Sequence, residues 1–235
     1  MPTTAFTYFD PTFILVIIGA VIVLGASAYM KSVYNKYGQI ANQRGITGEA
    51  ASKLILRTEG ISDVQILSVP GELTDHYDPR NRSLNLSDSS RRSTSIAAVG
   101  VAAHECGHAI QHNQNYWALQ LRSFLVPITN IGARLSWPII FLGILMSWNQ
   151  TLINIGVFLF LIVFFFQVVT LPVEFNASKR AINALEMHGV LSAEELNGTK
   201  KVLRAAALTY VASAASTLLQ VLRLRILFGG NRRND

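Results

Sequence analysis

Three long apolar segments constrain the fold more than any other feature, because about 20 consecutive apolar residues are enough to cross a lipid bilayer. They run from Phe13 to Met30, from Phe124 to Met146 and from about Leu152 to Thr170. A short polar break at 147–150 separates the last two, so we expect them to form a hairpin of membrane helices. Charged residues make up only 14% of the chain, against about 25% in ordinary soluble domains. We therefore expect a mainly α-helical membrane protein.

The charge distribution predicts how these helices are oriented. Residues 1–30 contain no Lys or Arg, and the break at 147–150 contains none, whereas basic residues gather in 31–122 and 179–204. Basic segments tend to stay on the cytosolic side of a membrane. We expect the N-terminus outside and both ends of the hairpin in the cytosol. The net charge of +6 then suits anionic lipid, so the lipid bilayer is an expected partner and nucleic acid is not.

The segment 31–122 has the mixed polarity of a water-exposed part with short elements. Thr47 opens a helical pattern that Gly60 closes, and residues 64–69 and 83–86 are typical of strands. Ser95 and the two residues before it offer N-caps for a helix that continues to about 108. We expect this helix to lie beside a small antiparallel sheet.

The C-terminal part, 172–235, is expected to be helical. Pro172 should end the second hairpin helix, so that residues 173–187 form a separate helix. Ser192 and Glu195 make a capping box for a last helix, whose apolar part covers 205–222. Basic residues follow that part, so we expect an amphipathic helix that packs or lies at the interface. The total is three membrane helices, or four if this helix crosses.

The sequence His104-Glu105-Cys106-Gly107-His108 carries the clearest chemical signal. On an α-helix, positions i and i+4 differ by about 40° in direction, so both histidines can hold one metal ion. Glu105 then lies where its carboxylate can take a proton from a water on the metal. Zinc held by three protein groups keeps a position for that water. Two surface histidines beside a glutamate are the alternative, but the small residues around this motif favour a packed metal site.

The third zinc ligand must come from elsewhere. His188, Glu186, Glu194 and Glu195 lie in a charged, helix-capping context and are expected to be solvated, which leaves two main candidates. His112 continues the same helix, about 12 Å along the axis from His104, so it cannot share the ion unless the helix breaks. Glu174 follows the hairpin, where an acid is costly unless it is paired. We predict Glu174 as the ligand, with a simple helix-dipole interaction as the alternative. Ser178, one turn further on, is placed to hydrogen-bond the ligand or a neighbour.

The group that stabilises charge on the substrate oxygen has no decisive signal. His76 and Tyr77 lie in the loop before the second strand, and Tyr210 lies in the last helix. Each side chain can donate a hydrogen bond to an oxyanion, although turn formation explains the first two equally well. The edge of the strand around 84–86 offers main-chain groups to an extended peptide.

The chain resembles the YugP-like neutral zinc metallopeptidases of bacteria, a membrane-bound family with a gluzincin-type HExxH motif. The resemblance covers essentially the whole chain and rests on the first apolar segment and on residues 73–79, 104–112 and 174–178. More distant gluzincin relatives carry an Asp four residues after their Glu ligand, where this chain has Ser178. The resemblance implies zinc ligation by His104, His108 and Glu174, with Glu105 as general base.

These features together predict a zincin-like α+β catalytic core carried by membrane helices. Residues 1–30 would be the anchor, 31–122 the cytosolic catalytic part, 123–171 the hairpin, and 172–235 the segment that supplies the third ligand. The expected enzyme is a zinc metalloendopeptidase that hydrolyses peptide bonds with zinc-activated water near the cytosolic membrane surface. Its expected substrates are peptides or proteins, membrane proteins among them.

Two other functions compete with this prediction. One is a non-catalytic membrane scaffold, in which zinc only fastens a helix to the hairpin. The other is a transporter or channel, which the scarcity of acids in the apolar segments disfavours. Cys106 is the only cysteine, so no intrachain disulfide forms, and its direction about 200° around the helix from His104 predicts a packing role. The sequence does not indicate an oligomeric state.

Overall fold

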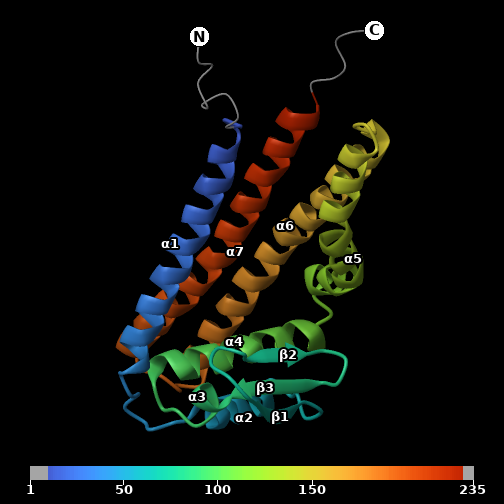
Figure 1. Cartoon of the computed structure of the whole chain (residues 1–235). Coiled ribbons are helices and arrows are strands. Elements are labelled where there is room, and N and C mark those ends of the chain that lie inside the picture. Colours follow the sequence, from blue (N-terminus) through green and yellow to red (C-terminus); the bar gives the residue numbers. More distant parts are fainter. Residues whose placement is uncertain (1–9, 230–235) are drawn as a thin grey trace. The chain divides into compact units, whose positions relative to one another are not determined.

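The computed structural model describes residues 10–229 and is mainly helical, with a small sheet (Figure 1). The elements, in chain order, are α1 (Phe13–Gly38), α2 (Gly48–Thr58), β1 (Gln65–Val69), β2 (His76–Asp78), β3 (Ser83–Ser87), α3 (Asp88–Arg91), α4 (Ile96–Asn113), α5 (Trp117–Leu145), α6 (Gln150–Met187) and α7 (Ala193–Phe228). Among them α1, α5, α6 and α7 are long and apolar enough to cross a membrane. The prediction of a mainly α membrane protein is confirmed, and α7 also meets the criteria for a membrane helix.

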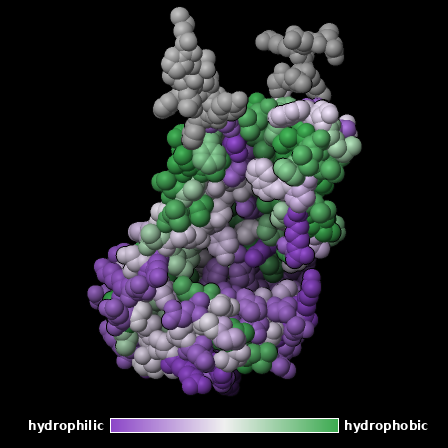
Figure 2. Space-filling model, in the orientation of Figure 1, coloured by the Kyte–Doolittle hydropathy of each residue, from purple (hydrophilic) through white to green (hydrophobic). Residues whose placement is uncertain are grey.

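The chain forms two compact units. Within the described residues, the first comprises 10–26, 124–168 and 210–229, and the second comprises 27–123 and 169–209. Hydrophobic residues dominate the visible surface of the helical first unit, whereas hydrophilic residues are frequent on that of the second (Figure 2). Within the first unit, α1 and α7 approach closely, because a Cβ added at Gly19 would lie 2.7 Å from Ser216 Oγ.

The turn between α5 and α6 falls at the predicted polar break. Ser147 and Trp148 have φ values of 56° and 61°, and Asn149 Oδ1 accepts hydrogen bonds from the backbone N–H groups of Thr151 and Leu152 in the first turn of α6. The predicted end of the second helix at Pro172 is wrong, because α6 runs without interruption to Met187. A proline removes one helical hydrogen bond, but breaking an apolar helix would leave more backbone groups unpaired.

The sheet of the second unit has the order β1-β3-β2 and is mixed. β2 pairs antiparallel with β3, whereas β1 pairs parallel with β3, so the prediction of an antiparallel sheet holds for one pair only. The reason is β2, a strand where a loop is predicted, which adds a second reversal of the chain. Because β3 has a strand on each side, its edge is not free for a peptide, and that prediction is wrong.

Helix α4 is the centre of the second unit, and most of its residues are buried. Ser95 Oγ accepts a hydrogen bond from the Ala98 backbone, as predicted for its N-cap. One side of α4 packs on α2, which begins where a helix start is predicted, with Thr47 as its N-cap. The core of the unit includes buried apolar residues of α2, β3, α4, α6 and α7. The predicted capping box at the start of α7 is present, since Ser192 N–H donates to Glu195 Oε2. This packing fixes α4, and α4 carries the motif.

Candidate metal centre

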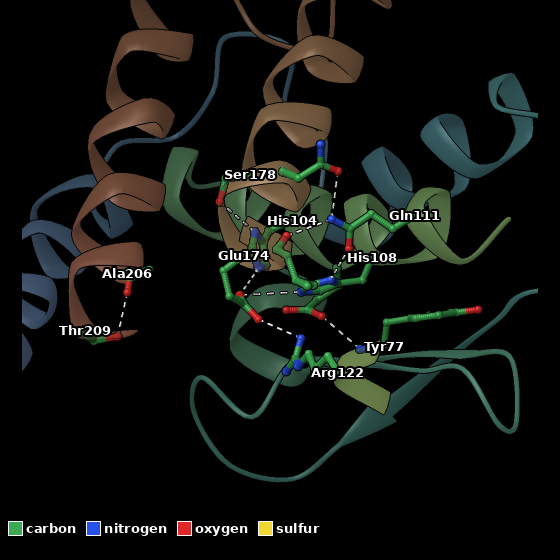
Figure 3. A network of polar contacts seen from close by, with 12 residues as sticks. Tyr77, His104, His108, Gln111, Arg122, Glu174, Ser178, Ala206 and Thr209 are labelled. Atoms are coloured by element: carbon green, nitrogen blue, oxygen red, sulfur yellow. Dashed lines mark hydrogen bonds and ion pairs between the residues drawn. The ribbon is translucent and has the colours of Figure 1, made fainter. Parts of the chain in front are cut away.

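Two helices of the second unit bring three possible metal ligands together (Figure 3). His104 and His108 lie one turn apart on α4, and Glu174 lies on α6. One donor atom of each residue lies within 4.8 Å of the other two. Glu174 Oε2 is 3.2 Å from His104 Nε2 and 3.7 Å from His108 Nε2. The structure therefore gathers the three residues that the sequence analysis named as ligands.

The spacing of these atoms fits a zinc ion. Zinc binds His nitrogen and carboxylate oxygen at about 2.0–2.2 Å, which puts two tetrahedral ligand atoms about 3.4 Å apart. Both distances from Glu174 Oε2 lie close to that value. The side chain of Glu174 is 3% exposed, so a carboxylate placed here needs cationic partners. Two imidazoles and a carboxylate are ligands that zinc commonly takes.

The second ring nitrogen of His104 has its own partner. Its Nδ1 lies 3.1 Å from the hydroxyl oxygen of Ser178 on α6. When Nδ1 carries the proton and donates to Ser178, the Nε2 lone pair faces the carboxylate of Glu174. Hydrogen bonds of this kind fix the tautomer and the direction of a metal-binding imidazole. Ser178 therefore lies where the sequence analysis expected it.

The ring of His108 is held by a chain of hydrogen bonds whose direction is defined. Arg180 Nε, which can only donate, lies 2.7 Å from Asn176 Oδ1. Gln111 Nε2 donates to the same Oδ1 at 2.9 Å and to the Val173 carbonyl at 2.8 Å. Gln111 Oε1 is then the atom that accepts from His108 Nδ1, at 3.0 Å. Because Nδ1 must carry the proton, the lone pair of His108 is on Nε2, on the side of Glu174.

Glu105 is almost enclosed and faces β2. The residue is 8% exposed, and its Oε2 accepts a hydrogen bond from the Tyr77 backbone N–H at 3.0 Å. Burial raises the pKa of Glu105 to about 7. A carboxylate with a pKa near neutrality is suited to accept and return a proton at neutral pH. The main chain of β2 therefore orients Glu105.

The other candidates from the sequence lie as follows. The ring of His76 is exposed, and its Nδ1 contacts the Thr74 carbonyl. The Tyr77 hydroxyl is 2.8 Å from His112 Nδ1, and burial lowers the pKa of His112, which favours the neutral ring that accepts this bond. Tyr210 lies on α7 in the first unit, so its role stays a prediction. His112 is not in the group of three ligands, and Tyr77 contacts Glu105 through its backbone.

Two residues of this site are not among those predicted from the sequence. Gln111 is fully buried behind His108, and Arg122 Nη1 lies 2.9 Å from Glu174 Oε1. The spacing of Gln111, three residues after His108 on the same helix, was a usable signal. For Arg122 the signal was the buried acid itself, since Glu174 requires a cation and Arg122 is the last basic residue before the hairpin.

One helix of the site carries two imidazoles and a glutamate, a second helix supplies a carboxylate, and the chain has long apolar helices. These features together are typical of the class of membrane-associated zinc peptidases. Residues 12–229 match the model of the family described as "Putative neutral zinc metallopeptidase", and the chain belongs to this family. The chain is also similar to the "Putative membrane protease YugP" of Bacillus subtilis (strain 168). The two are 43% identical over 203 residues, which are 86% of this chain and 90% of that protein. The family match and this similarity confirm the expected family, and zinc is its cofactor. No solved structure matches the chain significantly.

Proposed function

We propose that the chain is a membrane-bound zinc endopeptidase that hydrolyses peptide bonds near the cytosolic membrane surface. In this proposal His104, His108 and Glu174 hold zinc, and Glu105 is the general base. The observation that carries it is the convergence of three ligand atoms within 4.8 Å, from helices that are distant in the sequence. Glu105, beside the first of these ligands, supplies the general base that hydrolysis needs.

Each residue of the site has its own role in the proposed hydrolysis. Held by His104, His108 and Glu174, a zinc ion would polarise the substrate carbonyl and make the attacking water more acidic. Glu105 takes the proton of that water and delivers it to the nitrogen of the leaving amine. The Tyr77 N–H holds Oε2 of Glu105, which leaves Oε1 to accept the proton. Ser178 and Gln111 keep the two imidazoles turned toward the metal position.

The competing scaffold function requires a different ligand set. A structural zinc site is closed by four protein ligands, whereas a catalytic site has three and one open position. Within residues 10–229, the group around His104 contains three such donors. The donor count therefore favours the enzyme.

The membrane topology is part of the proposal. Residues 1–30 anchor the chain with the N-terminus outside, 123–171 form the membrane hairpin, and 172–235 bring Glu174 back to the catalytic part, 31–122. The support is the gathering of basic residues in 31–122 and 179–204. An alkaline phosphatase reporter inserted at Asn149 should be active outside the cytosol, and one inserted at Lys31 inactive. The reverse pattern would contradict this orientation.

The decisive experiment separates metal binding from hydrolysis. Glu105→Gln keeps the size of the side chain but removes the base, so the purified variant should retain zinc and lose cleavage of casein. Glu174→Ala should lose zinc and activity together, and a chelator should abolish wild-type cleavage. Undiminished cleavage by Glu105→Gln would refute the mechanism, and a zinc-loaded wild type that cleaves no peptide would favour the scaffold.

A further inference from the structure

The two oxygens of Glu174 have different partners. Oε2 faces both imidazoles, at 3.2 Å from His104 Nε2 and 3.7 Å from His108 Nε2. Oε1 faces away from them and accepts a hydrogen bond from Arg122 Nη1 at 2.9 Å. Figure 3 shows Arg122 beside Glu174, with the contact drawn between them. The carboxylate is thus divided between a metal side and an arginine side.

This division has a chemical consequence for a metal ligand. A carboxylate can bind a metal ion through one oxygen or through both, and a free carboxylate can rotate between these modes. A guanidinium group is always charged and donates in a fixed plane, so it holds the oxygen that it contacts. With Oε1 held by Arg122, only Oε2 is directed to the position between His104 and His108. A second bound oxygen would occupy the position that water or substrate needs.

The chain positions Arg122 for this role from a third helix. Arg122 lies on α5, whereas the ligands lie on α4 and α6. Arg122 and Glu174 are each 26 positions from Trp148, in the turn that joins α5 to α6. In a pair of helices joined by a short turn, equal spacing from the turn brings two residues to the same level. The side chain of Glu174 is nearly enclosed, with 3% exposed, and that of Arg122 is partly buried, with 28% exposed.

We propose that Arg122 is a positioning residue of the metal centre, which holds Glu174 as a ligand through one oxygen and so keeps a coordination position open. The inference rests on the proposed function only in taking His104, His108 and Glu174 as the zinc ligands. Arg122 acts through Glu174 and not on the substrate. Loss of Arg122 should therefore change zinc affinity and zinc coordination more than it changes peptide binding.

The test measures metal binding and coordination in the full-length protein in detergent. Arg122→Gln should raise the zinc dissociation constant, measured by chelator competition, about 10- to 100-fold. In the cobalt-substituted protein the visible absorption should weaken, because the second oxygen of Glu174 becomes free to bind and raises the coordination number. In the zinc-loaded protein kcat should fall more than KM changes. Arg122→Lys should recover part of the zinc affinity, since it retains a charged donor.

Arg91→Gln is the matched control. Arg91 has the same side-chain exposure, 28%, and pairs with Glu49 at 2.7 Å, but Glu49 is not in the metal group. The Arg91→Gln variant should leave the zinc affinity and the cobalt spectrum unchanged. If Arg122→Gln also leaves both unchanged, the inference is overturned. It is equally overturned if Arg122→Gln and Arg91→Gln weaken zinc binding to the same extent, because a general loss of stability then explains the effect.

A parallel variant separates this inference from the proposed function. His104→Ala should abolish tight zinc binding. If it does and Arg122→Gln binds zinc as the wild type does, the positioning role alone fails. If His104→Ala itself binds zinc normally, the metal site lies elsewhere and the proposed function fails with it.

Discussion

Replacing Gly107 with alanine tests how closely the two ligand-bearing helices must approach. A Cβ at this position would lie 2.3 Å from the carbonyl oxygen of Ala177 and 2.9 Å from its carbonyl carbon. Ordinary contacts of a Cβ begin at 3.4 Å, so α6 would have to move by about 1 Å. The obstacle is the backbone of α6, so no side chain can rotate out of the way.

This displacement is large on the scale of a metal site. Ala177 lies three residues from Glu174, in the same turn of α6, so the two move together. Ligand distances in a zinc site tolerate changes of about 0.2 Å, several times less than the shift that the methyl group requires. We expect Gly107→Ala to weaken zinc binding at least about 10-fold. Overpacking should also lower the free energy of unfolding by about 1–3 kcal/mol.

The assay is zinc affinity by chelator competition, together with thermal unfolding of the metal-free protein. Gly25→Ala is the control, because a Cβ at Gly25 in α1 would meet nothing within 4 Å. That variant should bind zinc normally and gain up to about 1 kcal/mol of stability from its higher helix propensity. A Gly107→Ala protein with wild-type zinc affinity would refute the argument that this contact sets the distance between the ligands.

Three further results are expected. Gln111→Leu removes the acceptor that holds the ring of His108, so the zinc dissociation constant from chelator competition should rise about 10- to 100-fold; an unchanged constant would contradict the hydrogen-bond chain. Burial raises the pKa of Cys106 to about 12, so the folded protein should resist iodoacetamide at pH 8 and react only on unfolding, and fast labelling of folded protein would speak against this. Hydrogen bonds from Arg91 and Lys53 lower the pKa of Glu49 from 4.5 to about 2, so their stabilisation is present above pH 4.5 and is lost as the pH falls toward 2. Glu49→Gln should lower the free energy of unfolding at pH 7 by less than about 1 kcal/mol and flatten its decline in acid, whereas an unaltered acid profile would exclude this contribution.

Local patterns in the sequence determine much of this protein. Apolar length predicts α1, α5 and α6, because a bilayer imposes a minimum span whatever the tertiary contacts are. Caps at Thr47, Ser95 and Ser192 predict where helices begin, since each satisfies backbone groups within a few residues. The motif at His104 predicts a metal site in the same way, because helical geometry alone places positions i and i+4 on one face.

The tertiary structure decided the features that depend on residues far apart in the chain. The three-residue strand β2 has no sequence signal of its own, but its pairing with β3 makes the sheet mixed and directs the Tyr77 N–H to Glu105. Local helix rules predicted a break at Pro172, whereas the apolar surroundings favour a continuous α6.

The contacts of the metal ligands also depend partly on the sequence and partly on the tertiary structure. The sequence by itself determined that Glu174 is an acid in need of a partner, because burying an unpaired carboxylate is costly in any fold. Only the packing of α4, α5 and α6 decided which of its oxygens faces His104 and which faces Arg122. The backbone fixes the spacing of residues along one helix. Contact between helices depends instead on the size of the side chains between them, and Gly107, which has no side chain, lets α4 and α6 approach closely.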